Sequence, residues 1–155
     1  MTRAKRRDQA GAVLMEFALA FSLFSVAFLA VIEFSRLMLT WGAAAEATRR
    51  GARLASTCEF GTSQATTIRT KVKPLLTASG QVNLGQRTDW LAITYLPVGC
   101  GAESCTMVDV RLNAVSVSLL VPGWSNAITL PAFPARLPRE AMRNSTSDGS
   151  NANCA

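Results

Sequence analysis

The sequence contains no histidine and a single tyrosine among its 155 residues, and its carboxylates number only ten. Without histidine, the common serine or cysteine triad has no imidazole base. The carboxylates that follow the apolar N-terminal segment are few and scattered, and no phosphate-binding loop of the Walker or G-x-G-x-x-G type occurs. We therefore expect neither enzymatic activity nor a cofactor.

The lack of histidine also argues against a zinc site. The four cysteines, in addition, do not have the paired spacing of zinc ligands. All four lie beyond the apolar segment, where an oxidising compartment would favour disulfides. Three pairings of four cysteines exist. The short interval between Cys100 and Cys105 suits a stapled turn, which would leave Cys58 to pair with Cys154.

Charge is sparse and unevenly placed. Up to Gly11 the chain carries four basic residues and one acidic residue, while the other 12 basic and 9 acidic residues are spread over the rest. A nucleic-acid-binding protein concentrates basic residues on one folded face, so we expect no nucleic-acid partner. The densest basic group, Lys5, Arg6 and Arg7, directly precedes the apolar run and marks the cytoplasmic side of a membrane segment.

Residues 12–32 form an apolar run of 21 residues in which Glu16 is the only charge. As a helix it would be about 31 Å long, close to the thickness of the hydrocarbon core of a bilayer. A secretory signal peptide has a shorter apolar region that ends at a small-residue cleavage site. We therefore expect a signal anchor, with residues from about 36 onward on the far side of the membrane.

The helix is expected to continue through 33–55, which lacks proline and is rich in good helix formers. Small residues recur there every four positions, which allows another helix or a sheet to approach closely. Gly51 costs a helix about 1 kcal/mol relative to alanine, which indicates a packing reason for it. The two rows are Ala44, Thr48 and Ala52, and Ala47, Gly51 and Ala55.

The remaining sequence predicts a short helix followed by strands. We expect a helix from Ser63, as a candidate N-cap, to about Lys73, which Pro74 ends or kinks. Alternating apolar residues predict strands near 91–95, 107–119 and 127–130, with a bulge or bend at 114–115 where the apolar phase reverses. Prolines at 131, 134 and 138 are expected to prevent regular pairing. The sequence thus predicts an α+β fold, in which a long N-terminal helix packs on a small antiparallel sheet.

The order of basic leader, Gly11, Glu16, Phe17 and apolar helix resembles the class III signal of type IV pilin-like proteins. The Glu-Phe pair and the stretch AAEATRRGARLAS at 44–56 are similar to TadE-like pseudopilins of the tight-adherence (Flp pilus) system. Major Flp pilins are much shorter and usually have tyrosine after the glutamate. The resemblance therefore implies a minor subunit of TadE or TadF type.

This resemblance implies cleavage between Gly11 and Ala12 by a prepilin peptidase. The new α-amino group on Ala12 is cationic near neutral pH. Glu16 would then meet such a terminus, on its own or a neighbouring chain, which would neutralise it and set the register of subunits. The implied partners are the peptidase, other minor pilins, the major Flp pilin, the inner-membrane assembly platform and membrane lipid. The implied work is structural, in the assembly of a pilus used for surface attachment.

The resemblance also implies a pilin-like protein that crosses the bacterial inner membrane once, with its C-terminal domain in the periplasm. The expected organisation is a leader at 1–11, a membrane helix at 12–35 and a periplasmic continuation at 36–56. A small α+β domain at 57–143 and a disordered tail at 144–155, unless Cys154 holds it, would follow.

Alternatives remain open at this point. An unprocessed, signal-anchored periplasmic binding or envelope-assembly protein would need no glutamate at position 16, which would then extend to the membrane interface without a partner. A minor subunit of a related secretion pseudopilus would share the processing and differ in its partners. Phe21, Phe24 and Phe28 either line a seam between helices or face lipid.

Overall fold

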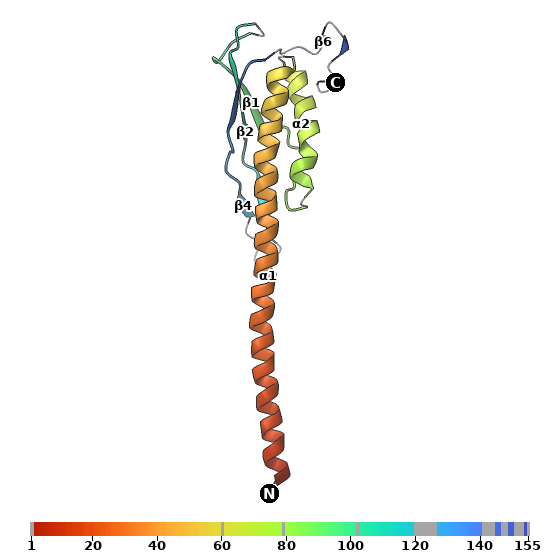
Figure 1. The fold of residues 1–155 in the computed structure, drawn as a ribbon, viewed down its shortest axis with the longest axis vertical. Coiled ribbons are helices and arrows are strands. Elements are labelled where there is room, and N and C mark those ends of the chain that lie inside the picture. The colour runs from red at the N-terminus through yellow and green to blue at the C-terminus, as the bar shows by residue number, and fades with distance from the viewer. Residues whose placement is uncertain are drawn as a thin grey trace. The chain divides into compact units, whose positions relative to one another are not determined.

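The computed structural model describes residues 2–59, 61–78, 80–101, 103–119, 127–140, 145–146, 149–150 and 154, without the side chains of 2–10, 62, 145–146 and 149–150. The chain forms two compact units, Met1–Arg36 and Leu37–Ala155. Helix α1, Thr2–Thr57, provides the described part of the first unit and continues into the second (Figure 1). Its length follows from the absence of proline and the abundance of alanine and leucine.

In the second unit, α1 is joined by helix α2, Thr62–Thr77, which lies beside it (Figure 1). The expected N-cap and the expected end of the helix are wrong. Gly61, not Ser63, occupies the N-cap position, and α2 runs past Pro74 to Thr77. Proline so near the helix end removes only one backbone hydrogen bond, and the Pro74 carbonyl still accepts the N–H of Ala78 at 3.0 Å.

The main sheet has the strand order β1-β2-β5, and both of its pairings are antiparallel. β1 is Leu91–Leu96, β2 is Met107–Leu112 and β5 is Ala135–Pro138. The expectation that the prolines prevent regular pairing is therefore wrong, because β5 pairs with β2 along its whole length. Proline is tolerated in an edge strand, where one side of the backbone needs no partner.

The predicted reversal of phase after β2 is confirmed. Ala114 has a positive φ of 48°, and the chain leaves the main sheet there to enter β3, Ser116–Ser118. β3 pairs with β4, Ala127–Thr129, in a separate antiparallel sheet. A bridge from Val82 to Val117 connects the segment after α2 to this second sheet.

Two short strands and Cys154 are described in the tail. β6, Ser145–Thr146, pairs with β7, Gly149–Ser150, and Cys154 is buried. The other residues of the predicted disordered tail lie outside the described part of the chain.

The core of the second unit lies among the C-terminal half of α1, α2 and one face of the sheet. α2 contributes Ile68, Val72 and Leu76, which are at most 1% exposed, at helical spacing. β2 contributes the alternate residues 108, 110 and 112. The α+β fold with a long N-terminal helix and a small antiparallel sheet is thus as predicted.

Candidate assembly site

The apolar part of α1 in the first unit is exposed on all sides. Its large hydrophobic side chains between Val13 and Phe34 are 41–72% exposed. A soluble protein rarely exposes so much contiguous apolar surface, so this segment needs lipid or other helices around it. The helix is long and apolar enough to cross a membrane.

Glu16 lies in this apolar stretch and is exposed. Among the described residues it makes no ion pair, whereas Glu33, near the end of the same unit, lies 3.5 Å from Arg36. Two carboxylates on one helix thus differ in their surroundings. A carboxylate in the hydrocarbon core is costly unless a cation or donor pairs with it, so Glu16 is the side chain here that calls for an external partner.

Gly11 lies within α1, and a Cβ built on it would meet no atom within 4 Å. Glycine costs a helix about 1 kcal/mol relative to alanine. The fold of the described chain therefore provides no packing reason for a glycine at this position. Phe17, five residues from Ala12, stacks on Phe21 with a centroid distance of 6.1 Å, and Phe24 stacks on Phe28 at 6.0 Å.

The two rows of small residues on α1 lie in the core of the second unit. Gly51 is in close contact with the sheet, because a Cβ there would lie 3.3 Å from Leu91 Cδ2 and from Val110 Cγ1. The other members of the rows are buried as well, between 0 and 1% exposed: Ala44, Ala47, Thr48, Ala52 and Ala55. Gly51 therefore lets the sheet approach α1 closely, and the rows belong to the buried face of the helix in this unit.

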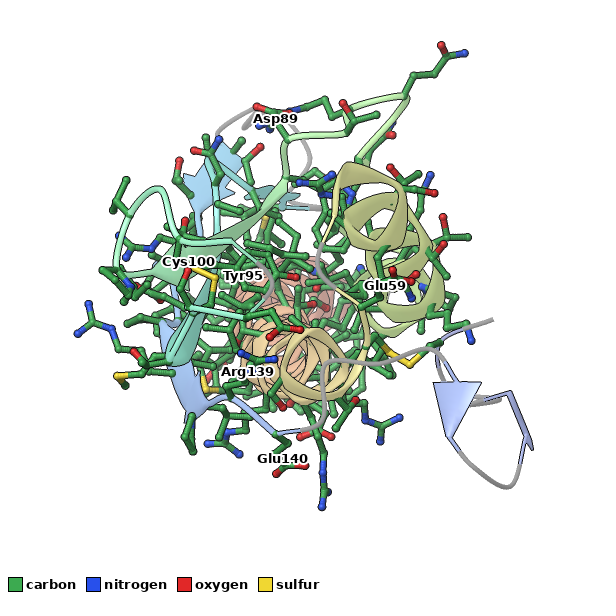
Figure 2. All side chains as sticks on the ribbon, turned by 90° about the horizontal axis from the view of Figure 1, so that it is seen from above. Glu59, Asp89, Tyr95, Cys100, Arg139 and Glu140 are labelled. Atoms are coloured by element: carbon green, nitrogen blue, oxygen red, sulfur yellow. A yellow bond between two sulfur atoms is a disulfide. The ribbon has the colours of Figure 1, made fainter. Side chains whose placement is uncertain are left out.

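Both disulfides are present. Cys58, just after α1, is bonded to Cys154 with a Cα–Cα distance of 5.4 Å, and Cys100 is bonded to Cys105 at 5.1 Å. Figure 2 shows Cys100 over the sheet side of the second unit. Gln64 of α2 donates a hydrogen bond from Nε2 to the Cys154 carbonyl at 2.8 Å. The first disulfide thus anchors the end of the chain to the helices, and the second closes the β1–β2 hairpin.

Several polar contacts were not predicted from the sequence. Thr40 on α1 donates to Gln81 Oε1 at 2.8 Å, and both residues are buried. The Arg87 guanidinium donates two hydrogen bonds to Asp89, which lower the pKa of that carboxyl, and two more to the carbonyls of residues 113 and 114. Thr40 and Gln81 are 41 positions apart, and Arg87 is 26 and 27 positions from the carbonyls that it binds, so only the tertiary structure identifies these contacts.

Asp109 makes the least expected of these contacts. It stands on the polar face of β2, yet it is only 2% exposed. Its Oδ2 accepts hydrogen bonds from Arg111 and from Arg136 Nε, the latter at 3.3 Å, and its Oδ1 has no partner within the described structure. The alternation of residues 107–112 did place Asp109 opposite the core, and the two arginines bury it there.

A groove of about 470 Å3 separates α1 from the edge strand β5 in the second unit. Trp41 and Phe133 meet edge to face nearby, with a centroid distance of 5.3 Å. The residues that line the groove are Ala45, Thr48, Arg49, Ala52 and 133–137. Thr48 and Ala52 belong to the rows that were predicted to pack, whereas no pattern in the sequence predicted that Arg49 and Arg136 line one groove.

The fold and these features define an α+β protein whose exposed N-terminal apolar helix could span a membrane, which is consistent with a membrane-anchored protein. Among the described residues, no group of histidine, cysteine and carboxylate side chains is arranged to hold a metal ion. Residues 11–53 match the family model described as TadE-like protein, so the resemblance drawn from the sequence is confirmed over that segment. No curated protein and no solved structure matches the chain.

Proposed function

We propose that this protein is a minor pseudopilin that supports assembly of a Flp pilus and, through it, surface attachment. The observation that carries the proposal is Glu16, a carboxylate that forms no ion pair with the described residues, in an exposed apolar helix and five residues after Gly11. The family match begins at the same glycine. The family itself supports a part in the assembly of a Tad pilus, with other components of that system as partners.

In the proposed mechanism, a prepilin peptidase cuts between Gly11 and Ala12 and removes the basic leader. The N-terminal amine of Ala12 would then lie about one helical turn from Glu16. Its positive charge offsets the carboxylate within the hydrocarbon, either in the same chain or between neighbouring subunits. An unpaired amine and an unpaired carboxylate are both costly in lipid. Pairing of the Ala12 amine of one subunit with Glu16 of the next would therefore favour association of the subunits in one axial register. The protein would have no catalytic role in this process.

The test is the N-terminal sequence of the protein from native membranes, together with two substitutions. A mature chain that begins at Ala12 is expected from the wild type, and an unprocessed chain from Gly11→Leu. The matched control is Gly42→Leu, since Gly42 is exposed on the same helix and nothing lies within 4 Å of its Cβ position. A wild-type chain that still begins at its first residues, in cells with an active peptidase, would leave the unprocessed signal anchor as the better account.

Glu16→Gln tests the second step. We expect normal cleavage but a loss of surface pili and of attachment of tenfold or more, because the amine then has no counter-charge. Glu33→Gln is the control, as Glu33 already pairs with Arg36 in its own helix. Equal pilus counts in the Glu16 and Glu33 variants would contradict the proposed role of Glu16.

A further inference from the structure

We propose that the groove between α1 and β5 is the docking site for an acidic helical segment of a different pilus subunit. The inference rests on the proposed function, since it takes the partner to be another component of the assembly. The groove lies entirely within the second unit and combines an apolar floor, an obstructed strand edge and an excess of positive charge.

The walls of the groove suit side chains of a partner better than a small polar ligand. One wall is formed by α1, where Ala45 is partly exposed and Thr48 is buried, and the other is formed by 133–137. Small residues on α1 let a second helix approach its backbone closely, as ridges pack into a shallow groove. Phe133 closes one part of the wall and is held in place by its edge-to-face contact with Trp41.

The edge of β5 does not favour an added strand. β5 is the outer strand of its sheet, and Pro134 and Pro138 stand on either side of Arg136. Proline lacks the backbone N–H that a new strand would need as a donor. Prolines at a sheet edge are a common protection against strand addition. A partner must therefore bind mainly through side chains, which favours a helix over an extended segment.

The charge of the groove identifies the chemistry of the partner. Among the described residues that line it, Arg49 and Arg136 are charged and none is a carboxylate. Asp109 holds Arg136 at 3.3 Å on the sheet face opposite the core, so Arg49 is the charge that remains for a partner. Arg49 is exposed, and within the described structure neither it nor Arg53, one turn further along α1, forms an ion pair, although the adjacent Arg50 pairs with Glu46 at 2.7 Å.

Two like charges at i and i+4 of a helix repel each other, so a carboxylate from outside would relieve this repulsion. A helix with glutamate or aspartate opposite Arg49 provides this charge together with apolar contacts to the groove floor.

A second copy of this chain would be a poor occupant. Residues 37–155 carry eleven basic and seven acidic residues, so two copies of this unit repel each other. Three of the acidic residues, Glu46, Asp89 and Asp109, are already engaged by arginines of the same chain. The structure therefore favours contact between this subunit and an acidic neighbour of another kind.

The experiment uses the full-length protein in cells that assemble the pilus. A photo-crosslinking residue, p-benzoyl-phenylalanine, replaces Ala45 in the groove or, as a control, the exposed Thr70 on α2. We expect a crosslink from position 45 alone, to an acidic helical segment of another pilus component, mapped by mass spectrometry. Crosslinking mainly to a second copy of this chain or to lipid, or no more crosslinking from 45 than from 70, would overturn the inference.

A charge reversal provides an independent readout. Arg49→Glu is expected to reduce the crosslink at least tenfold, and replacement of the contacted acidic residue in the partner by lysine is expected to restore it. Lys71→Glu is the matched control, because Lys71 is exposed on α2 and does not line the groove. An undiminished crosslink in the Arg49 variant would also refute the docking site.

The outcome separates the groove from the function. A mapped acidic partner outside the pilus system would preserve the docking site and refute the proposed function. The opposite result is also informative. If the chain is cut before Ala12 and pili depend on Glu16, but position 45 gives no crosslink, the proposed function stands and the docking site is refuted.

Discussion

Two glycines of α1, Gly51 and Gly42, differ in what surrounds them. A Cβ at Gly51 would lie 3.3 Å from two side chains of the sheet, whereas Gly42 has nothing within 4 Å. Glycine at position 51 lowers the helix propensity, but it lets the sheet approach α1 closely. This contact helps to bury the side chains of Leu91 and Val110. Neither fact is visible from the identity of the residue alone.

Replacement of Gly51 by a large residue tests this contact. Gly51→Leu is expected to lower the free energy of unfolding by about 1–3 kcal/mol, because the added atoms overpack the interface with the sheet. Gly42→Leu, with the same gain in helix propensity, is expected to raise it by about 0.5–1 kcal/mol or leave it unchanged. Denaturant unfolding of the purified protein in detergent measures both. Equal effects of the two substitutions would argue against close packing at Gly51.

At the scale of elements, two disulfides stabilise the tail and the β1–β2 hairpin. The Cys58–Cys154 disulfide joins residues 96 positions apart and holds the tail at the end of α1. The Cys100–Cys105 disulfide closes a loop of only five positions in the β1–β2 hairpin. Because a cross-link restricts the unfolded chain more when its loop is longer, the two bonds should differ in their contribution to stability.

Paired substitutions measure this difference. Loss of the long-range bond in C58A/C154A is expected to cost about 4–5 kcal/mol, and loss of the short one in C100A/C105A about 2 kcal/mol, by the loop-entropy relation. Both values come from unfolding of the full chain under identical conditions. A larger loss in C100A/C105A would indicate that the hairpin, not the tail, limits the stability of the second unit.

At the scale of the whole molecule, the two units have contrasting surfaces. The first exposes apolar side chains throughout, and the second buries its apolar residues beneath a basic surface. Such a division is typical of a protein with one part in lipid and the other in water. The basic residues before the apolar run predict a cytoplasmic N-terminus.

Reporter fusions test this topology. Alkaline phosphatase, which is active only in the periplasm, is expected to be active when fused after residue 140, whereas a cytoplasm-specific fluorescent reporter at the same point is expected to be dark. Reversal of Lys5, Arg6 and Arg7 to glutamate is expected to reduce phosphatase activity severalfold, since the orienting charge is lost. High fluorescence of the unmodified fusion would place the C-terminal unit in the cytoplasm.

The sequence by itself determined those features that depend on local composition. A run of 21 residues with Glu16 as its only charge has few alternatives to a membrane-length helix. The alternation along 107–119, with its reversal of phase, sufficed to predict a strand and the bend at 114–115. The spacing of Gly11, Glu16 and Phe17 likewise sufficed for the resemblance that the family match confirms over 11–53. Local patterns of this kind do not require knowledge of what lies across the core.

The tertiary structure decided what depends on distant partners. Pro134 and Pro138 were expected to end regular structure, yet β5 forms because it lies at the sheet edge, where one side of its backbone needs no partner. Asp109 became a buried anchor because arginines from two strands cover it, and Arg49 became part of a groove because β5 lies alongside α1. Sequence spacing cannot specify such contacts, since they depend on which strands are neighbours and on which face of α1 the sheet covers.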